Sequence, residues 1–468
     1  MRKRENAYLT VYLILSLTAV LTLCLLLIEG VRKNGAALEA SCAADVGMQS
    51  IMAEYHRELL KQYNLFAIDA SYGTASCGKK NTEAHLYHYL EKNLRLEERD
   101  FFFLHTSGAE LTCVSILTDN NGAVFRKRAV EAIRDDVGLE LLEQLQEWVE
   151  TVEINGLEEA KLEQEKALLD REIEEYEYEN EDGTVEKLDN PTDQLNEMRR
   201  KGILTLVLAD NQELSNRTLE TDGLIGNRIA QGKVSRGNLD DMDSKETLAE
   251  RFLFQEYLLR YLGCFGREKE EGGLQYQLEY LIVGKNADTE NLRSVAGRLC
   301  GLREAANAAY IFSDAEKSGE AEVLAAAICT ALFVPELIPV LHASILLGWA
   351  YAESVYDVKL LLAGEKVPLL KDRSSWHLGL FEALSGNLAT GKGSERGLSY
   401  EDYLRIFMML ADQDTLTVRA MDMVEADIRK TPGNAYFRLD GCYDRIQSRI
   451  NITGDRGYAF ELIRAKSY

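Results

Sequence analysis

A run of 23 residues without a formal charge, from Asn6 to Ile28, lies near the start of the chain. At about 1.5 Å per residue, a helix of this length covers roughly 34 Å, which is enough to cross a hydrocarbon core of about 30 Å. Residues 2–4 are all basic, and Tyr8 and Tyr12 lie near the first end of the run, where aromatic rings favour the membrane interface. These features predict one membrane-spanning helix, with a short cytoplasmic N-terminus and nearly all of the chain on the other side.

A cleaved signal peptide is the alternative interpretation of this run. Such a peptide usually has an apolar region of about 7–15 residues that ends at a small-x-small cleavage site. Here the run is longer, Arg32 and Lys33 follow it, and no Ala-x-Ala site is close. The residues before Cys42 include Glu39, where a lipoprotein signal has an aliphatic residue. We therefore predict a retained anchor.

The helix is expected to continue beyond the membrane as an amphipathic stalk. No proline interrupts the chain from Ala7 to Tyr63, and apolar residues recur at helical spacing with one gap of six. These apolar residues are Leu38, Cys42, Val46, Met52, Tyr55 and Leu59. The pattern predicts that they form the face by which the stalk packs on a globular domain.

The segment Ala7–Leu13 resembles the start of the small pseudopilins of Tad-type pilus systems, which read Gly-Ala-x-Thr-Val-Glu before their apolar run. The resemblance implies a pilin-like plan, in which a half-apolar, half-amphipathic helix precedes a globular domain. Asn6 stands where a glycine would precede cleavage by a prepilin peptidase, and Tyr12 stands where the pilin glutamate would be. These departures favour a fixed membrane accessory over a processed filament subunit.

Further resemblance covers essentially the whole chain. The stretches that carry it are Ala53–Leu60, Tyr63–Phe66, Asp69, Gln255–Tyr257, Glu279–Lys285, Leu302–Asn307, Trp349–Ser354 and Val367–Leu369. They resemble an uncharacterised family of membrane-anchored proteins of Gram-positive bacteria, often associated with Tad-like pilus gene clusters. That family supplies no catalytic assignment to carry over.

Charge and composition narrow the function classes. The net charge is −24, and nucleic-acid binding needs a basic surface, so we expect no nucleic acid partner. Between Glu140 and Asp189 there are 19 acidic and 4 basic residues. This run is interpreted as a solvated helix face, with a site for cations or a basic partner as the alternative. The chain has 5 Pro in 468 residues, which favours helix.

We predict a predominantly helical α+β fold with a small antiparallel sheet. Residues 110–118 are β-prone, Asp119–Gly122 supply turn chemistry, and the tail from Ala435 is read as strands that pair with the Leu111 region. Helices are expected from about Val124, over the charged stretch Gly138–Glu179, from Asn190-Pro191, over 247–262 and 290–310, and from Ser399 to about Arg429. The expected organisation is a tail (1–5), the anchor (6–31), the stalk helix (32–66), an α+β region with acidic helices (67–214), a loop (215–246), a helical core (247–434) and C-terminal strands (435–468).

A second apolar stretch covers residues 323–352 and contains Pro335 and Pro339. The prolines divide it into runs of roughly 12 and 13 residues, which are too short to span a membrane alone. We interpret it as a buried helical hairpin. The alternative is a second membrane segment, which would reverse the topology of the C-terminal third.

No constellation of catalytic, cofactor-binding or metal-ligating residues rises above background. His85 and His88 could share a metal at helical spacing, but no zinc signature surrounds them, and packing or surface roles are favoured. Glu353 and Asp357 share a helical face and could support acid–base chemistry. The alternatives are a solvent-facing edge or pairing with Lys359 and Lys366. The eight cysteines show no metal-ligand spacing and are expected to act mainly as small buried hydrophobes.

We therefore expect a non-enzymatic, membrane-anchored extracytoplasmic component of a Tad-like or type IV pilus-like envelope system. Its partners would be the membrane and other envelope proteins, with no cofactor and no identified small-molecule substrate. The alternative is an extracytoplasmic ligand-binding or sensing module that acts with a membrane partner, because about five cytoplasmic residues cannot signal alone. Ser16, Thr18 and Thr22 would offer weak polar contacts to such a partner helix.

Overall fold

A computed structural model describes residues 2–95, 102–136, 138, 140–179, 185–187, 192–208, 213–238, 247–386, 393, 397–455 and 457–468. The fold is predominantly helical with a small antiparallel sheet, which confirms the predicted α+β class. The chain forms two compact units. Unit 1 comprises Met1–Arg128, Asn227–Asp243 and Thr431–Tyr468, and unit 2 comprises Ala129–Gly226 and Ser244–Lys430.

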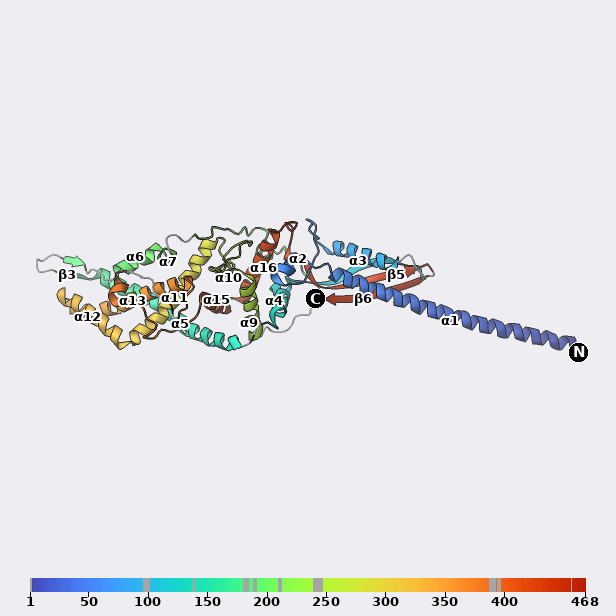
Figure 1. Ribbon diagram of the computed structural model, residues 1–468, viewed down its shortest axis with the longest axis horizontal. Helices are drawn as coiled ribbons and strands as arrows, with labels where there is room; N and C mark the ends of the chain where they lie inside the picture. The colour runs from blue at the N-terminus through green and yellow to red at the C-terminus, as the bar shows by residue number, and fades with distance from the viewer. Residues whose placement is uncertain are drawn as a thin grey trace. The chain divides into compact units, whose positions relative to one another are not determined.

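Unit 1 begins with α1, Arg2–Met52, which Figure 1 shows as one continuous helix. The helix ends before the predicted limit of residue 66. The reason is a competing set of backbone bonds: the His56 N–H donates to Ala67 O at 2.9 Å, and Tyr55 forms a β-bridge with Ile68. A separate short helix, α2 (Arg57–Tyr63), then starts from His56, whose Nδ1 accepts from the Leu59 N–H at 3.1 Å.

The sheet of unit 1 is antiparallel and is centred on β5 (Cys442–Gly454). On one side, β5 pairs with β2 (Leu104–Ile116). On its other side, β5 pairs with β1 (Ile68–Asp69) at its start and with β6 (Tyr458–Ser467) along the rest of its length. Leu111 lies opposite Ser448, which confirms that the C-terminal strands pair with the Leu111 region. Residues 436–440 were read as the start of a strand, but the strand begins only at Cys442, after a 3-10 turn.

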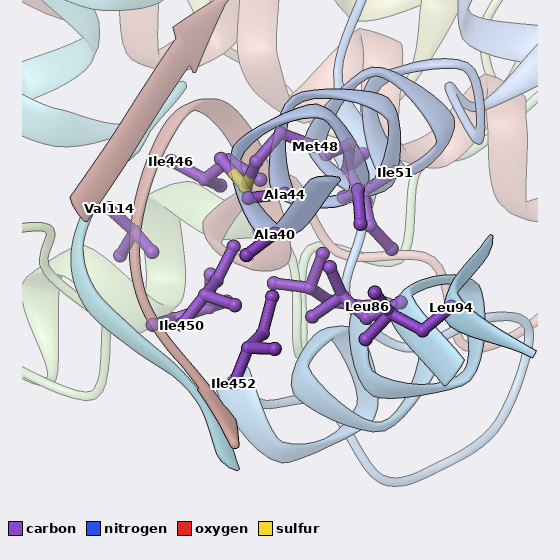
Figure 2. Packing of buried hydrophobic residues seen from close by; sticks show 14 of the residues in the cluster. Ala40, Ala44, Met48, Ile51, Leu86, Leu94, Val114, Ile446, Ile450 and Ile452 are labelled. Atoms are coloured by element: carbon purple, nitrogen blue, oxygen red, sulfur yellow. The ribbon is translucent and has the colours of Figure 1, made fainter. Parts of the chain in front are cut away.

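One face of this sheet carries the hydrophobic core of unit 1. α1 and α3 (Lys79–Leu94) pack on it, and Figure 2 shows Met48 and Ile51 of α1 and Leu86 of α3 gathered with Ile446 and Ile450 of β5. Along β5, residues on the opposite face alternate as half-buried or exposed. Unit 1 is therefore a two-layer helix-on-sheet module.

The stalk part of α1 packs mainly through a different face from the predicted one, although Met52 packs against the core and Leu59, in α2, is buried as predicted. The buried stripe is Ala36, Ala40, Ala43, Ala44, Met48 and Ile51. In contrast, Leu38 is 67% exposed and Val46 is 44% exposed, and Cys42 is also exposed. Small alanines allow the helix backbone to approach the sheet, where the bulk of the core comes from the isoleucines of β5. The buried face of α1 is therefore the one with small residues that fit against the isoleucines of β5, and it is not the face with the most hydrophobic residues.

The turn predicted at Asp119–Gly122 is present inside α4 (Asp119–Ile133). Asn120, Asn121 and Gly122 all have positive φ and interrupt the helical geometry. Asn and Gly tolerate this left-handed conformation better than other residues do. The sequence chemistry and the structure agree here.

Unit 2 is helical apart from a short hairpin of β3 (Glu177–Glu179) and β4 (Val185–Lys187). Its helices are α5 (Glu140–Glu175), α6 (Asp193–Lys201), α7 (Ile203–Val207), α9 (Leu248–Tyr261), α10 (Gln277–Val283), α11 (Asp288–Ser313), α12 (Ala315–Ala331), α13 (Ile338–Leu362), α14 (Leu380–Leu384), α15 (Tyr400–Leu410) and α16 (Gln413–Arg429). The helix start predicted at residues 190–191 lies outside the described residues. The region 215–246 was predicted as a loop, but it contains α8 (Ile225–Ala230).

The helix predicted from Ser399 to about Arg429 is two helices. Ser399 forms the predicted capping box with Asp402 at the start of α15. The chain becomes extended at Ala411, and the Asp412 side chain accepts from the Thr415 N–H at 2.8 Å to start α16. An aspartate that offers its side chain to the backbone favours a helix cap over a helix interior, so the helix restarts there.

The apolar stretch with two prolines folds as α12 and α13, joined by the 3-10 turn η1 (Pro335–Leu337). The most apolar window of the second helix is 72% buried inside the protein. This burial is the property expected of the predicted buried hairpin. The first helix of the hairpin, α12, is less buried than α13, and its Val323 is 72% exposed.

Candidate functional site

Two described helices are long and apolar enough to cross a membrane, and they differ in how much of their apolar window is buried inside the protein. The second, in residues Pro335–Leu362, is the largely buried core helix of unit 2. The first lies in α1, where the most apolar window has a mean hydropathy of 2.7 and is 0% buried. The length and apolarity of this helix and its place near the N-terminus fit a membrane anchor or a signal sequence.

Hydroxyl groups in the apolar half of α1 are satisfied within the helix itself. Ser16 donates to Leu13 O at 3.0 Å, and Thr18 donates to Leu15 O at 2.9 Å. Thr22 likewise donates to Thr18 O at 2.7 Å. A hydroxyl that donates to its own helix can enter a lipid environment without an unsatisfied proton, so these residues do not require a partner helix.

The last strand, β6, runs alongside α1 and is tied to it by polar contacts at both ends. The Tyr458 hydroxyl donates to Glu29 Oε1 at 2.7 Å, next to the apolar segment. Near the middle, the Arg464 guanidinium lies 2.7 Å from both Asp45 Oδ1 and Ser41 Oγ. At the far end, the Tyr468 hydroxyl donates to Met52 O. The apolar helix is thus continuous with a helix that is fixed to the sheet.

Just after the end of α1, the Glu54 carboxylate contacts three polar side chains. It accepts hydrogen bonds from Tyr89 at 2.7 Å and Tyr72 at 3.1 Å, and His85 Nδ1 lies 3.1 Å from its carboxylate. Burial, reinforced by the Glu54 charge, raises the pKa of Tyr72 well above its usual value. His85 is therefore a structural partner of the carboxylate, whereas His88 is exposed. The structure shows no shared metal geometry for this pair among the described residues.

The predicted pair Glu353 and Asp357 lies in the interior of unit 2 with neither carboxylate exposed to solvent. Their charged partners are Lys371 and Arg303, rather than the lysines suggested by proximity in sequence. The Lys371 ammonium lies 2.7 Å from Glu353 Oε1 and 2.6 Å from Asp357 Oδ1. The Arg303 guanidinium lies 3.0 Å from Asp357 Oδ2. Two buried anions thus face two buried cations.

Backbone groups and neutral side chains complete this network. Glu353 accepts from the backbone N–H groups of His377 at 3.0 Å and Leu378 at 2.9 Å. Asn307 donates to Asp357 Oδ2 at 3.1 Å, and Arg303 donates to Leu369 O at 2.6 Å. Hydrogen bonds and ion pairs thus stabilise these buried charges, and within the described part of the chain Asp357 Oδ1 is held by the Lys371 ammonium alone.

Glu353, Asp357 and His377 offer ligand atoms within 4.8 Å of one another, which raises the question of a metal. The Lys371 ammonium occupies the position between the two carboxylates and also donates to Ser375 O at 2.8 Å. Burial alone would raise the pKa of Glu353, but the His377 hydrogen bond and the Lys371 ammonium outweigh it and lower that pKa. The arrangement is therefore a cation site already filled by a lysine, and it does not fit a metal ion.

Comparison with known proteins identifies the kind of chain. Residues 181–454 match a family described as a family of unknown function, DUF5702. The match covers more than half of the chain, so the protein belongs to this family. Neither the curated proteins nor the solved structures contain a significant match. The matched residues include the Glu353–Lys371 network of unit 2 and the central strand β5 of unit 1.

Proposed function

We propose that this protein is a non-enzymatic, membrane-anchored extracytoplasmic component of a Tad-like or type IV pilus-like envelope system. The observation that carries the proposal is the division of α1: the apolar window of its first half is 0% buried, while its second half packs on a sheet. A helix that enters a folded module without a break transmits position, so the module would be held at a fixed distance from the membrane.

The basic residues 2–4 favour a cytoplasmic N-terminus, and the absence of a processing site favours retention of the anchor. The resemblance of Ala7–Leu13 to Tad pseudopilins supports the pilus-like setting. Asn6 and Tyr12 replace the residues used in pilin processing and assembly, which supports a fixed accessory rather than a filament subunit.

The non-enzymatic part of the proposal is supported by the state of the most catalytic-looking residues. Glu353 and Asp357 are shut off from solvent and neutralised by Lys371 and Arg303. General acid–base catalysis needs a group within hydrogen-bond reach of a substrate, and a filled, buried network offers no such access.

Purification of the full chain from its native membrane in mild detergent tests the assembly role. We expect it to leave the membrane together with other envelope proteins, and to separate from them when the detergent becomes harsh. Pilus ATPase and platform genes next to its own gene would support the same setting. Recovery of the chain alone and monomeric would contradict the assembly role and would favour a ligand-binding module.

A further inference from the structure

The two outer edges of the sheet in unit 1 differ in whether their outward backbone N–H groups have side-chain acceptors. On β2, side chains accept hydrogen bonds from outward N–H groups. Thr106 N–H donates to Glu91 Oε1 at 2.7 Å, and Leu111 N–H donates to Glu83 Oε1 at 2.8 Å. Further along, Val114 N–H donates to Asn238 Oδ1 at 2.9 Å. These caps block the addition of another strand to the β2 edge.

The outer edge of β6 carries no comparable caps. The Tyr468 N–H donates to Asp444 O of β5, so even-numbered residues of this end of the chain point their backbone groups inward. By the alternation of an antiparallel strand, the outward groups belong to Ala459, Glu461, Ile463, Ala465 and Ser467. Among the residues that the structure describes, none of these five N–H groups has a bonded partner. Only Ile463 O is engaged, by its own neighbour Arg464.

We propose that the outer edge of β6 binds an extended segment of a partner protein, which adds a strand to this sheet. An exposed row of backbone donors and acceptors is the surface that such strand addition uses, and side chains along the edge select the segment. The length of β6 is 10 residues, so a bound segment would make several main-chain bonds.

Side chains along β6 specify the chemistry of the segment. Phe460 and Leu462 lie half-buried on the α1 face of the strand and pack against its core, so apolar residues suit the positions beside them. Arg464 is paired with Asp45, whereas Lys466 has no acidic partner among the described residues. These side chains all lie on the same face of β6, so the preferred segment carries, at every second position, apolar residues beside Phe460 and Leu462 and an acidic residue beside Lys466.

The test uses the full chain in lipid nanodiscs and two nine-residue peptides, Thr-Val-Thr-Val-Thr-Ser-Thr-Glu-Thr and its reverse, which place two valines and one glutamate on one face for either strand direction. Residue-resolved amide hydrogen exchange should slow at least tenfold at Glu461, Ile463 and Ala465 when one of these peptides is saturating. The same peptides with lysine in place of glutamate should protect these amides less. Ile463→Pro removes one outward N–H and should abolish the protection, whereas Ile463→Thr, which keeps this N–H, should retain it.

A charge reversal keeps the test decisive if Ile463→Pro fails to fold. Lys466→Glu should switch the preference from the glutamate peptides to the lysine peptides. Unchanged exchange at the three amides with all of these peptides would overturn the proposal, as would protection that persists in a folded Ile463→Pro variant or a preference unaltered by Lys466→Glu. Such a failure would leave the anchoring role of α1 untouched, because the measurement does not depend on membrane topology.

Discussion

The Lys371 ammonium lies 2.7 Å from the Glu353 carboxylate, and both side chains are fully shielded from solvent. The lysine comes from the segment after α13, and the glutamate comes from the middle of that helix. Because burying an ion without a partner is costly, each of these side chains makes the burial of the other tolerable. The network therefore fixes how the segment around residue 371 folds back on α13.

Lys371→Met should destabilise the protein by about 3–5 kcal/mol, because it leaves the Glu353 carboxylate buried without its cation. The double variant Lys371→Met/Glu353→Gln removes both charges and should recover most of the loss. Lys366→Met, which changes an exposed lysine nearby, serves as the control and should cost less than about 0.5 kcal/mol. Denaturant unfolding followed by circular dichroism measures all three, and equal losses in the single and double variants would argue against the pairing.

Glu279 predicts a pH dependence of stability. It is fully buried, accepting from Phe265 N–H at 2.8 Å and Tyr400 at 2.9 Å, and burial raises its pKa to about 7. The unfolded chain releases this proton near pH 4.5, so between about pH 4.5 and 7 the unfolded state is favoured increasingly as pH rises. The cost reaches about 3 kcal/mol above pH 7.

Glu279→Gln should remove this cost, so the variant should match the parent protein near pH 4.5 and exceed its stability at pH 8. Unfolding free energies measured across this range check the prediction. Glu270→Gln, which removes an exposed carboxylate of the same unit, should leave the pH profile nearly unchanged. A parallel pH profile for Glu279→Gln and the parent would show that Glu279 is ionised in the folded state.

The buried alanine stripe of α1 predicts that a substitution within it destabilises unit 1, whereas a substitution on the exposed face of the helix has little effect. Ala44→Leu places three extra carbons against the sheet and should destabilise unit 1 by about 1–3 kcal/mol. Leu38→Ala removes a side chain that is 67% exposed and should change the stability by less than about 0.5 kcal/mol. Thermal unfolding of both variants decides the matter. A larger loss from Leu38→Ala would restore the face predicted from hydrophobicity.

Structural features that depend on residues close together in the sequence could be predicted. The uncharged run of α1, the turn at Asn120 and Asn121, and the capping box at Ser399 depend on neighbouring residues, and the structure contains all three. The strand β5 was also expected, together with its pairing to the Leu111 region.

Features decided by tertiary contacts could not be predicted in the same way. The face by which α1 packs depends on the isoleucines of β5, about 400 residues later in the chain. Lys371 lies in a loop with no distinctive pattern, so nothing in the sequence marked it as the partner of Glu353. The end of α1 at Met52 depends on backbone bonds from His56 to Ala67. Predicting any of these three features requires knowing which distant segment of the chain packs against the residues concerned.

Membrane topology is tested most directly by labelling cysteines in intact cells with a membrane-impermeant maleimide. Cys77 is exposed on unit 1, so a variant that keeps it as the single cysteine should label without permeabilisation. Glu5→Cys in a cysteine-free background should label only after permeabilisation, and the labelled band should have the mass of the uncleaved chain. Labelling of Cys77 only in permeabilised cells, or loss of residue 5 from the mature protein, would contradict a retained anchor with an extracytoplasmic module.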